Sequence, residues 1–115
     1  MDKKLEQIGK VTIEDQVIAD YVQEIILNNK DVSRFHTSLT EGLTKNILGI
    51  ESATSSGIRI QNDDYNLTIN LHIIVYYGVN IPQLSYDLQT TIKRSVEKFT
   101  GLNVDAVNIT VEGID

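Results

Sequence analysis

Cysteine is absent from this chain of 115 residues. Its absence excludes disulfide bonds, thiolate metal ligands and a thiol nucleophile, and it fits a reducing, cytosolic compartment. Basic residues are also scarce, because ten Lys and Arg stand against sixteen Asp and Glu, for a formal net charge of -6. The average field of the protein therefore repels phosphate backbones and anionic lipid surfaces, and we expect no nucleic-acid partner.

Long apolar runs are missing as well. The longest nearly uncharged run, Ile73 to Ile81, is far shorter than the roughly 20 residues that a helix needs to cross a bilayer. The first ten residues, MDKKLEQIGK, lack the apolar stretch of a signal peptide. We expect no membrane insertion, a flexible tail over residues 1–7, and one domain over residues 8–115, because a chain of this length can build a single core.

Motifs for catalysis or for binding a cofactor are absent too. Neither His36 nor His72 has a second histidine two or four residues further on, as a metal pair would require. The seven glycines form no phosphate-binding pattern and no G-x-x-G clamp for nucleic acid. No serine lies in a G-x-S-x-G context. The sequence therefore predicts no catalytic residue, no metal site and no cofactor.

The N-terminal part predicts a short strand and a helix. Val11 and Ile13 alternate with polar neighbours after a glycine, which is typical of a short strand. Apolar residues then recur on one side of a predicted helix from Val17 to Ile26. We expect Asp15 to cap this helix and Asn28 to follow its end.

A second, shorter helix is expected between residues 38 and 49. Ser38 and Glu41 have the spacing of a capping box, and Leu39, Leu43 and Ile47 follow at intervals of four residues. The stretch from Glu51 to Gly57 is small and polar and reads as a surface loop.

The middle of the chain predicts a β-hairpin with one apolar side. Ile58 and Ile60 begin a strand, turn residues follow at positions 62–64, and a long alternating run comes next. One set of its side chains is apolar: Leu67, Ile69, Leu71, Ile73, Val75 and Tyr77. The other set is mostly polar: Thr68, Asn70, His72, Ile74 and Tyr76. This asymmetry predicts that helices cover only one face of the sheet.

The C-terminal part predicts a long helix and a last strand. Asn80 is placed to accept from the amide of Gln83, whose side chain can reach back, and Pro82 fits the first turn. Gly101 stands where a left-handed residue would end the helix. The apolar stripe between them consists of Ile81, Leu84, Leu88, Ile92, Val96 and Phe99. A strand with alternating apolar residues follows at 107–111.

These elements predict an α+β fold with two layers. A small mixed sheet of three or four strands would carry helices on one face, in the chain order β-α-α-β-β-α-β.

Several short stretches resemble the alkaline shock protein family, the envelope stress response proteins of Gram-positive bacteria. The stretches are GKVTIEDQVIADYV, YYGVNIPQLSYDLQTTIKRSVEKFTGL and VDAVNITVEGI. Within them Tyr77-Gly78, Asn80, Gly101 and the Val107-Asn108-Ile109 triplet match the family's turns, caps and last strand. The chain departs from the family at Asp31, because members usually carry glycine before the valine that follows the first helix.

The resemblance implies a non-enzymatic, cytoplasmic protein of cell-envelope homeostasis. Some relatives self-assemble, or are held at the membrane by a separate membrane-anchored partner, so a homo-oligomer or a protein partner is expected. We expect contact through the uncovered face of the sheet, at Asn70, His72, Ile74 and Tyr76, or through an exposed strand edge. A helix or loop covering Ile74 and Tyr76 is the competing interpretation.

Two other functions stay open at this point. The first is a carrier of a small acyl ligand, because some relatives are associated with fatty-acid metabolism; it needs an apolar cavity between the long helix and the sheet. The second is a hydrolase, which needs an acid and a base that converge on one place.

Overall fold

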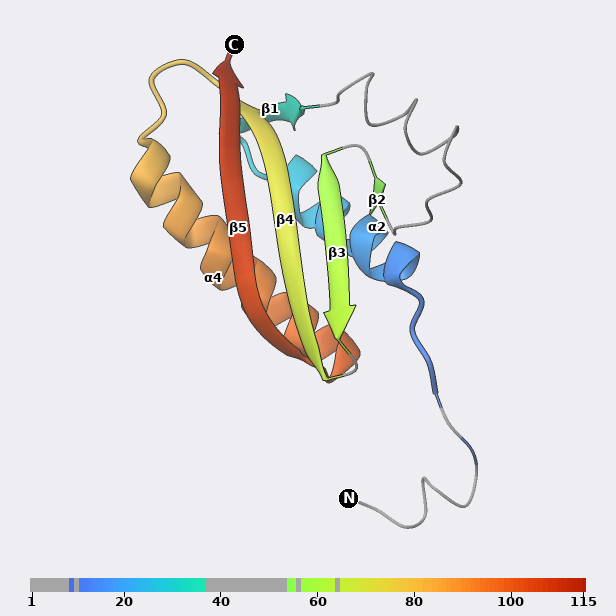
Figure 1. Cartoon of the computed structure of the whole chain (residues 1–115). Coiled ribbons are helices and arrows are strands. Elements are labelled where there is room, and N and C mark those ends of the chain that lie inside the picture. The colour runs from blue at the N-terminus through green and yellow to red at the C-terminus, as the bar shows by residue number, and fades with distance from the viewer. Residues whose placement is uncertain (1–8, 10, 37–53, 56, 64) are drawn as a thin grey trace, which may run out of the picture.

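The computed structural model describes residues 9, 11–36, 54–55, 57–63 and 65–115. The tail over residues 1–7 and the helix over residues 38–49, both predicted from the sequence, lie outside the described residues, as does most of the predicted loop at 51–57. Two helices and five strands are described (Figure 1). They are α2 (Asp15–Leu27), β1 (Val32–Phe35), β2 (Thr54–Ser55), β3 (Ile58–Asp63), β4 (Asn66–Val75), α4 (Ile81–Thr100) and β5 (Asn103–Ile114).

β4 is the central strand of the sheet. On one side it pairs antiparallel with β3 along its first half, from Asn66 to Leu71, and with β1 along its last three residues. On its other side it pairs parallel with β5 along its whole length, and β2 adds to β3. The mixed sheet is therefore confirmed. It has five strands because β1 and β2, which carry no clear alternation, also join it.

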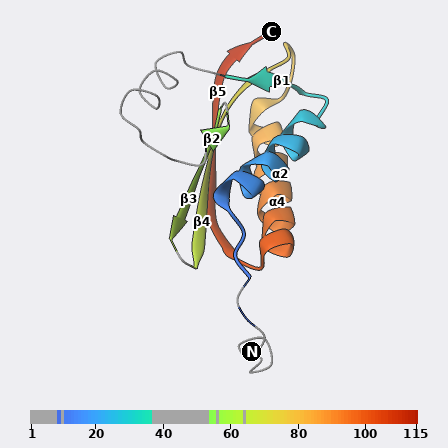
Figure 2. The ribbon, with the colours of Figure 1, turned by 90° about the vertical axis from the view of Figure 1, so that its right-hand side faces the viewer.

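Both described helices lie on the same face of this sheet (Figure 2). The core between the layers is almost wholly aliphatic, and no polar or charged side chain among the described residues is fully buried. β4 contributes every second residue to this core, as predicted: Leu67, Ile69, Leu71, Ile73 and Val75. The predicted α+β class with helices on one face is confirmed.

α4 begins and ends where the sequence predicts. The Asn80 side chain accepts a hydrogen bond of 3.1 Å from the Gln83 amide, and Pro82 occupies the first turn. Gly101 ends the helix in the left-handed conformation, at a φ of 76°. The predicted return contact from the Gln83 side chain to the start of the helix is wrong. The Gln83 side chain donates instead to Asp87, one turn further on. The buried stripe consists of Leu84, Leu88, Ile92 and Val96.

α2 lies beside α4 without a side-chain cap. The predicted cap at Asp15 is wrong: the helix begins at this residue, and the preceding Glu14 makes no capping hydrogen bond. The C-terminal prediction is confirmed, since Asn28 follows the last helical residue. The ring of Tyr21 stacks on Phe99 of α4 at a centroid distance of 4.3 Å. This stack joins the two helices at the solvent side of their interface.

Residues 11–14 form no strand, so the strand predicted at Val11–Ile13 is wrong. Val11 is 88% exposed, and no described strand lies beside it to accept its backbone hydrogen bonds. A short alternating pattern produces a strand only where a neighbour is available.

Two irregularities interrupt the pairing of β5 with β4. Leu67 pairs with Val104 and the next residue of β4 pairs with Ala106, so Asp105 is an extra residue. Near the other end, Ile73 pairs with Val111 and the next residue pairs with Gly113, so Glu112 is extra. Such bulges re-aim side chains and are common on edge strands. Between them the strand is regular over six residues, 106–111.

Candidate interaction surface

The face of the sheet turned away from α2 and α4, here called the open face, carries a row of amide side chains. Asn108 of β5 donates a hydrogen bond of 3.0 Å to Asn70 of β4. Asn70 in turn donates one of 3.4 Å to Gln61 of β3. The row crosses three strands, and each bond joins side chains at neighbouring positions of the register.

Two further polar pairs flank this row on β4 and β5. His72 Nδ1 lies 2.8 Å from a carboxylate oxygen of Glu112, and both side chains keep about a third or more of their surface exposed. At the other end, Asn103 donates to Asn66 over 2.9 Å. The open face therefore presents donors and acceptors that are hydrogen-bonded to one another across the strands.

The structure brings together two of the four residues predicted for the partner face. Asn70 and His72 lie on the open face and take part in its hydrogen bonds. Ile74 is only 6% exposed, and its side chain packs where Gly113 leaves room. Ile74 is therefore buried rather than exposed on the open face. The shorter helix that the competing interpretation places over it lies outside the described residues. Tyr76 lies past the end of β4 and is 49% exposed.

The aromatic residues after β4 form an exposed tip at the end of the sheet. The place of Tyr77 in the alternating run predicted that it lies on the core face. This prediction is wrong, because Tyr77 is 87% exposed. The strand ends at Val75, and Gly78 turns the chain at a φ of 88°. The Tyr77 amide donates a hydrogen bond to the carbonyl of Asp115, so the tip is fixed to the end of β5.

The side chain of Asp115 ties the ends of β1 and β5 together. Ser33 and Arg34 of β1 both donate to its carboxylate, the arginine Nε over 3.3 Å. The Ser33 hydrogen bond, followed by that of Arg34, holds the pKa of Asp115 below its ordinary value. The carboxylate is thus charged at neutral pH and fixes β1 next to the tip.

The outer side of β5 is an edge, because the only described strand that pairs with it is β4. α4 covers part of this edge with two side chains one turn apart. Lys93 Nζ donates to the Val104 carbonyl over 2.6 Å, and Glu97 accepts from the Val104 amide over 3.0 Å. Lys93 and Glu97 are themselves 3.1 Å apart. The pair takes the hydrogen-bonding role that a neighbouring strand would otherwise fill.

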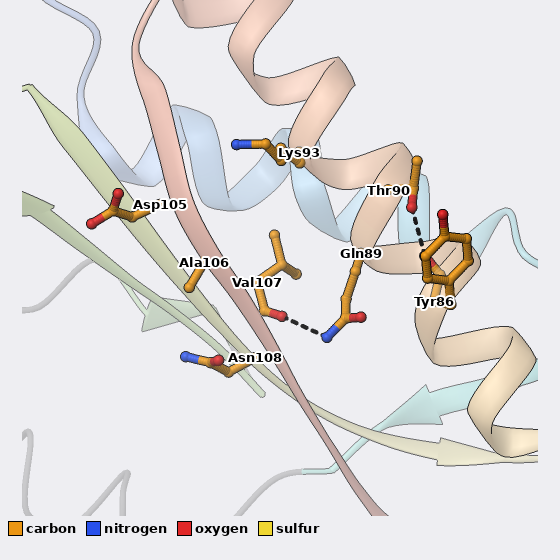
Figure 3. Close-up of a pocket in the computed structure, with 8 residues that line it drawn as sticks. All are labelled: Tyr86, Gln89, Thr90, Lys93, Asp105, Ala106, Val107 and Asn108. Atoms are coloured by element: carbon orange, nitrogen blue, oxygen red, sulfur yellow. Dashed lines mark hydrogen bonds between the residues drawn. The ribbon is translucent and has the colours of Figure 1, made fainter.

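Further along the edge, the Gln89 side chain donates a hydrogen bond of 3.0 Å to the Val107 carbonyl. Gln89, Lys93 and Glu97 lie on one side of α4 at intervals of four residues, and we call them the α4 clasp. A shallow groove of about 380 Å³ runs between this side of the helix and the strand (Figure 3). It is lined by Tyr86, Gln89, Thr90, Lys93, Asp105, Ala106, Val107 and Asn108.

The clasp should make stability depend on pH through Glu97. The Val104 amide, and then Lys93, donate to this carboxylate and hold its pKa below the ordinary 4.5. A carboxylate with a lowered pKa stabilises the folded state above its unfolded pKa, and this contribution is lost as the pH falls through the folded value. Below about pH 4.5, we expect the free energy of unfolding to fall more steeply in the wild type than in Glu97→Gln. Denaturant titrations at several pH values measure this; parallel curves would contradict it.

The residues missed by the sequence analysis are the cross-strand partners of the open face and the clasp. Gln61, Asn108 and Glu112 lie opposite β4 only through the register of three strands, which a single sequence does not reveal. Their polar character at alternate positions was the only available signal.

The described residues offer neither a metal-binding cluster nor a membrane-spanning helix. No group of three or more acidic or histidine side chains there is arranged to hold a metal ion. Within the same part of the chain, no helix is long and apolar enough to span a bilayer.

Comparison with protein families shows the family to which the chain belongs. A model of the alkaline shock protein 23 family, described as having a cell envelope-related function, matches residues 3–115. The chain belongs to this family. The resemblance inferred from the turns and caps is therefore confirmed, and the alkaline shock assignment extends over nearly the whole chain.

Three relatives of this alkaline shock family member are described as uncharacterised proteins. The uncharacterised protein YloU of Bacillus subtilis is 37% identical over 76 residues, which cover 66% of this chain and 62% of YloU. A second B. subtilis protein, the uncharacterised YqhY, is 25% identical over 115 residues, covering 99% and 83% of the two chains. The uncharacterised Spy1535 of Streptococcus pyogenes is 28% identical over 111 residues, covering 95% and 81%. The match to YloU spans under two thirds of that protein. No solved structure matches the chain.

Proposed function

We propose that this alkaline shock family member is a non-enzymatic protein-binding module of the cell envelope, and that it binds through the open face. One observation carries the proposal. The described helices cover a single face of the sheet, while the opposite face keeps an ordered row of amides from Gln61 to Asn108 exposed at its surface.

The chemistry of this surface fits a protein partner. Amide side chains both donate and accept, so they can pair with the polar groups of another protein surface. Since Asn70 is already held by its neighbours, little side-chain entropy is lost on binding. The exposed tyrosines 76 and 77 stand at the end of the same sheet, and tyrosine is enriched at interfaces.

The cell-envelope role of the family points to where such a partner would be. A chain that binds a membrane-anchored protein from the cytoplasm, or that associates with its own copies, would act at the envelope without inserting into it. Both kinds of partner belong to the proposal, and the open face serves either.

The acyl-carrier alternative gains no specific support. The apolar side of α4 is buried against the sheet at Leu88 and Ile92, among others. The grooves found over the described residues lie at the surface and are lined largely by polar side chains. The hydrolase alternative has no observation in its favour either.

The proposal predicts that charge on the open face weakens partner binding. Asn70→Lys introduces a bulky cation at the centre of the amide row and is expected to weaken binding by roughly tenfold or more, about 1.4 kcal/mol. Tagged protein is used to recover partners from the membrane and soluble fractions of the source cell, and the recovered partner is then titrated against each variant. The folded state should be retained, because this position lies on a surface and not in the core.

Thr91→Lys is the matched control, because it adds the same charge at an exposed position of α4, on the other layer. It should bind like the wild type. Equal binding by Asn70→Lys and Thr91→Lys would rule out the open face as the site of contact.

A further inference from the structure

The solvent-facing side of α2 carries apolar side chains that no other described element covers. Val17 is 45% exposed, and Tyr21, one turn further on, stacks on Phe99 of α4, which is 43% exposed. Residues four positions apart lie on the same side of a helix, so Val17, Tyr21 and Phe99 form one apolar patch. Single exposed apolar residues are common on soluble proteins, whereas adjoining ones with aromatic rings among them are typical of a binding surface.

The charged residues of α2 all have the same sign. Four acids lie within residues 14–27, and this stretch contains no lysine or arginine. Asp20 and Glu24 stand one turn apart on the exposed side, and among the described residues no base forms an ion pair with either of them. Lys30, after the helix, and Lys98, in α4, offset only two of the four acids. An excess of negative charge therefore borders the apolar patch.

A shallow depression of about 410 Å³ lies beside these two carboxylates. It is lined by Asp20, Gln23, Glu24, Leu27 and Asn28. The side chain of Leu27 is 48% exposed there. A lysine or arginine suits this place, because its aliphatic stem can pack on Leu27 while its charged end meets both carboxylates.

We propose that the α2 surface, formed by Val17, Asp20, Tyr21, Glu24 and Phe99, binds a basic amphipathic helix of a partner protein. The apolar side of that helix covers Val17 and the stack of Tyr21 on Phe99. A lysine or arginine next to its apolar side enters the depression at Asp20 and Glu24. Helices bound in this way are anchored by residues three and four positions apart.

The α2 surface goes beyond the proposed function, because it lies on the helical layer and not on the open face (Figure 2). The chain can therefore hold a different protein on each of its two layers. Such an arrangement joins two proteins that do not contact each other directly.

The charge of the α2 surface selects a basic partner. Nucleic acid, an anionic lipid surface or an acidic helix would bring like charges to Asp20 and Glu24 and would be repelled. The α2 surface of a second copy carries the same acids, so two such surfaces also repel each other. A helix that is apolar on one side and basic beside it satisfies both parts of the surface.

A synthetic helical peptide of leucine and lysine, with its leucines on one side, tests the charge requirement. The labelled peptide is titrated against the full chain at about 0.15 M salt, where distant charges are largely screened. Glu24→Lys is expected to weaken binding at least about tenfold, because one of the two carboxylates becomes a cation. Asp105→Lys makes the same change of charge at an exposed position of β5 and should weaken binding less than about threefold. Equal losses would show that net charge alone attracts the peptide and would overturn the proposal.

The apolar requirement is tested with a matched pair of valines. Val17→Ser should weaken binding of the peptide about tenfold, since it removes apolar surface that the leucines cover. Val11→Ser is the control: Val11 is 88% exposed and lies before α2, so this variant should bind like the wild type. A peptide with serine in place of leucine should not bind. Unchanged affinity for Val17→Ser, or for the serine peptide, would contradict docking on the apolar patch.

Asn70→Lys separates the α2 surface from the open face. It lies on the other layer and should bind the leucine–lysine peptide like the wild type. Loss of peptide binding in Asn70→Lys but not in Glu24→Lys would place the peptide on the open face and overturn the proposal. A wild type that binds no peptide would reject the α2 surface alone, because the proposed function is tested with the partner recovered from the source cell.

Discussion

Gly57→Ala is expected to lower the free energy of unfolding by about 3 kcal/mol or more, the cost of a strained backbone conformation plus a steric clash. Gly57 has a φ of 79°, which side chains other than glycine rarely adopt. A Cβ atom there would also lie 2.9 Å from the backbone oxygens of His36 and His72. Neither oxygen can move freely, because each belongs to the backbone where β1 meets β4. Denaturant unfolding of the variant measures the loss.

Gly101→Ala separates the two causes. Gly101 has nearly the same φ, 76°, but no atom lies within 4 Å of the added Cβ. Its replacement should therefore cost only about 1 kcal/mol, from the left-handed conformation alone. Equal losses for the two variants would show that crowding at Gly57 contributes nothing.

The crowding at Gly57 also bears on the open face. The Gly57 carbonyl accepts a hydrogen bond of 2.9 Å from the His72 amide, and the His72 carbonyl accepts one of 2.9 Å from His36. The backbone of His72 is thus bonded to the residue that follows β1 and to the residue that precedes β3, and its side chain lies beside Glu112. A substitution that separates these strands would disturb the surface proposed to bind a partner as well as the fold.

Ile92→Ala in α4 is the second change with a large expected effect, a loss of about 2–5 kcal/mol from a core cavity. The Ile92 side chain is fully buried between α4 and the sheet. Its removal would leave a void that the surrounding aliphatic side chains cannot fill without rearrangement. The measurement is again unfolding by denaturant, supported by the shift in Tm.

Ile114→Ala removes the same atoms from a surface position and serves as the control. Ile114 is 58% exposed, so its loss should change the free energy of unfolding by no more than about 0.5 kcal/mol. Similar effects from Ile92→Ala and Ile114→Ala would mean that α4 is not packed on the sheet as described. The described helices would then no longer leave the open face as the one side of the sheet that they do not cover.

Features with short-range causes were predicted well from the sequence. The ends of α4 depend on Asn80, Pro82 and Gly101, each of which acts on the backbone within a few residues of itself. The buried side of β4 follows from alternation along one strand. Such signals need no knowledge of distant segments, so the two-layer arrangement with one covered face could be inferred from them.

Features that depend on a distant neighbour were predicted poorly. Val11 and Ile13 have a strand-like pattern, but no described strand lies beside them. Residues 32–35 have little alternation, yet they form β1 because the end of β4 offers them a partner. Ile74 sits on the polar side of β4 and is buried all the same, and its side chain extends over Gly113 of β5.

On the candidate surface, too, the features with local causes were predicted and those that depend on distant segments were missed. Asn70 and His72 were predicted for the open face from alternation alone. Their hydrogen-bonding partners Gln61 and Glu112 were not, because they meet β4 only after three strands align. The α4 clasp on Val104 was missed for the same reason: helix and strand are consecutive in the chain, but only their packing brings Glu97 to the strand edge.

By itself the sequence determined the class of fold, the side of β4 that is buried and the alkaline shock family, because caps, turns and alternating apolar residues act locally. The tertiary structure alone decided which polar side chains meet on the open face and which part of the β5 edge stays unpaired. These outcomes depend on strand register and on the contact between α4 and β5, and a shift of one residue in the register would move every side chain of a strand to the opposite face.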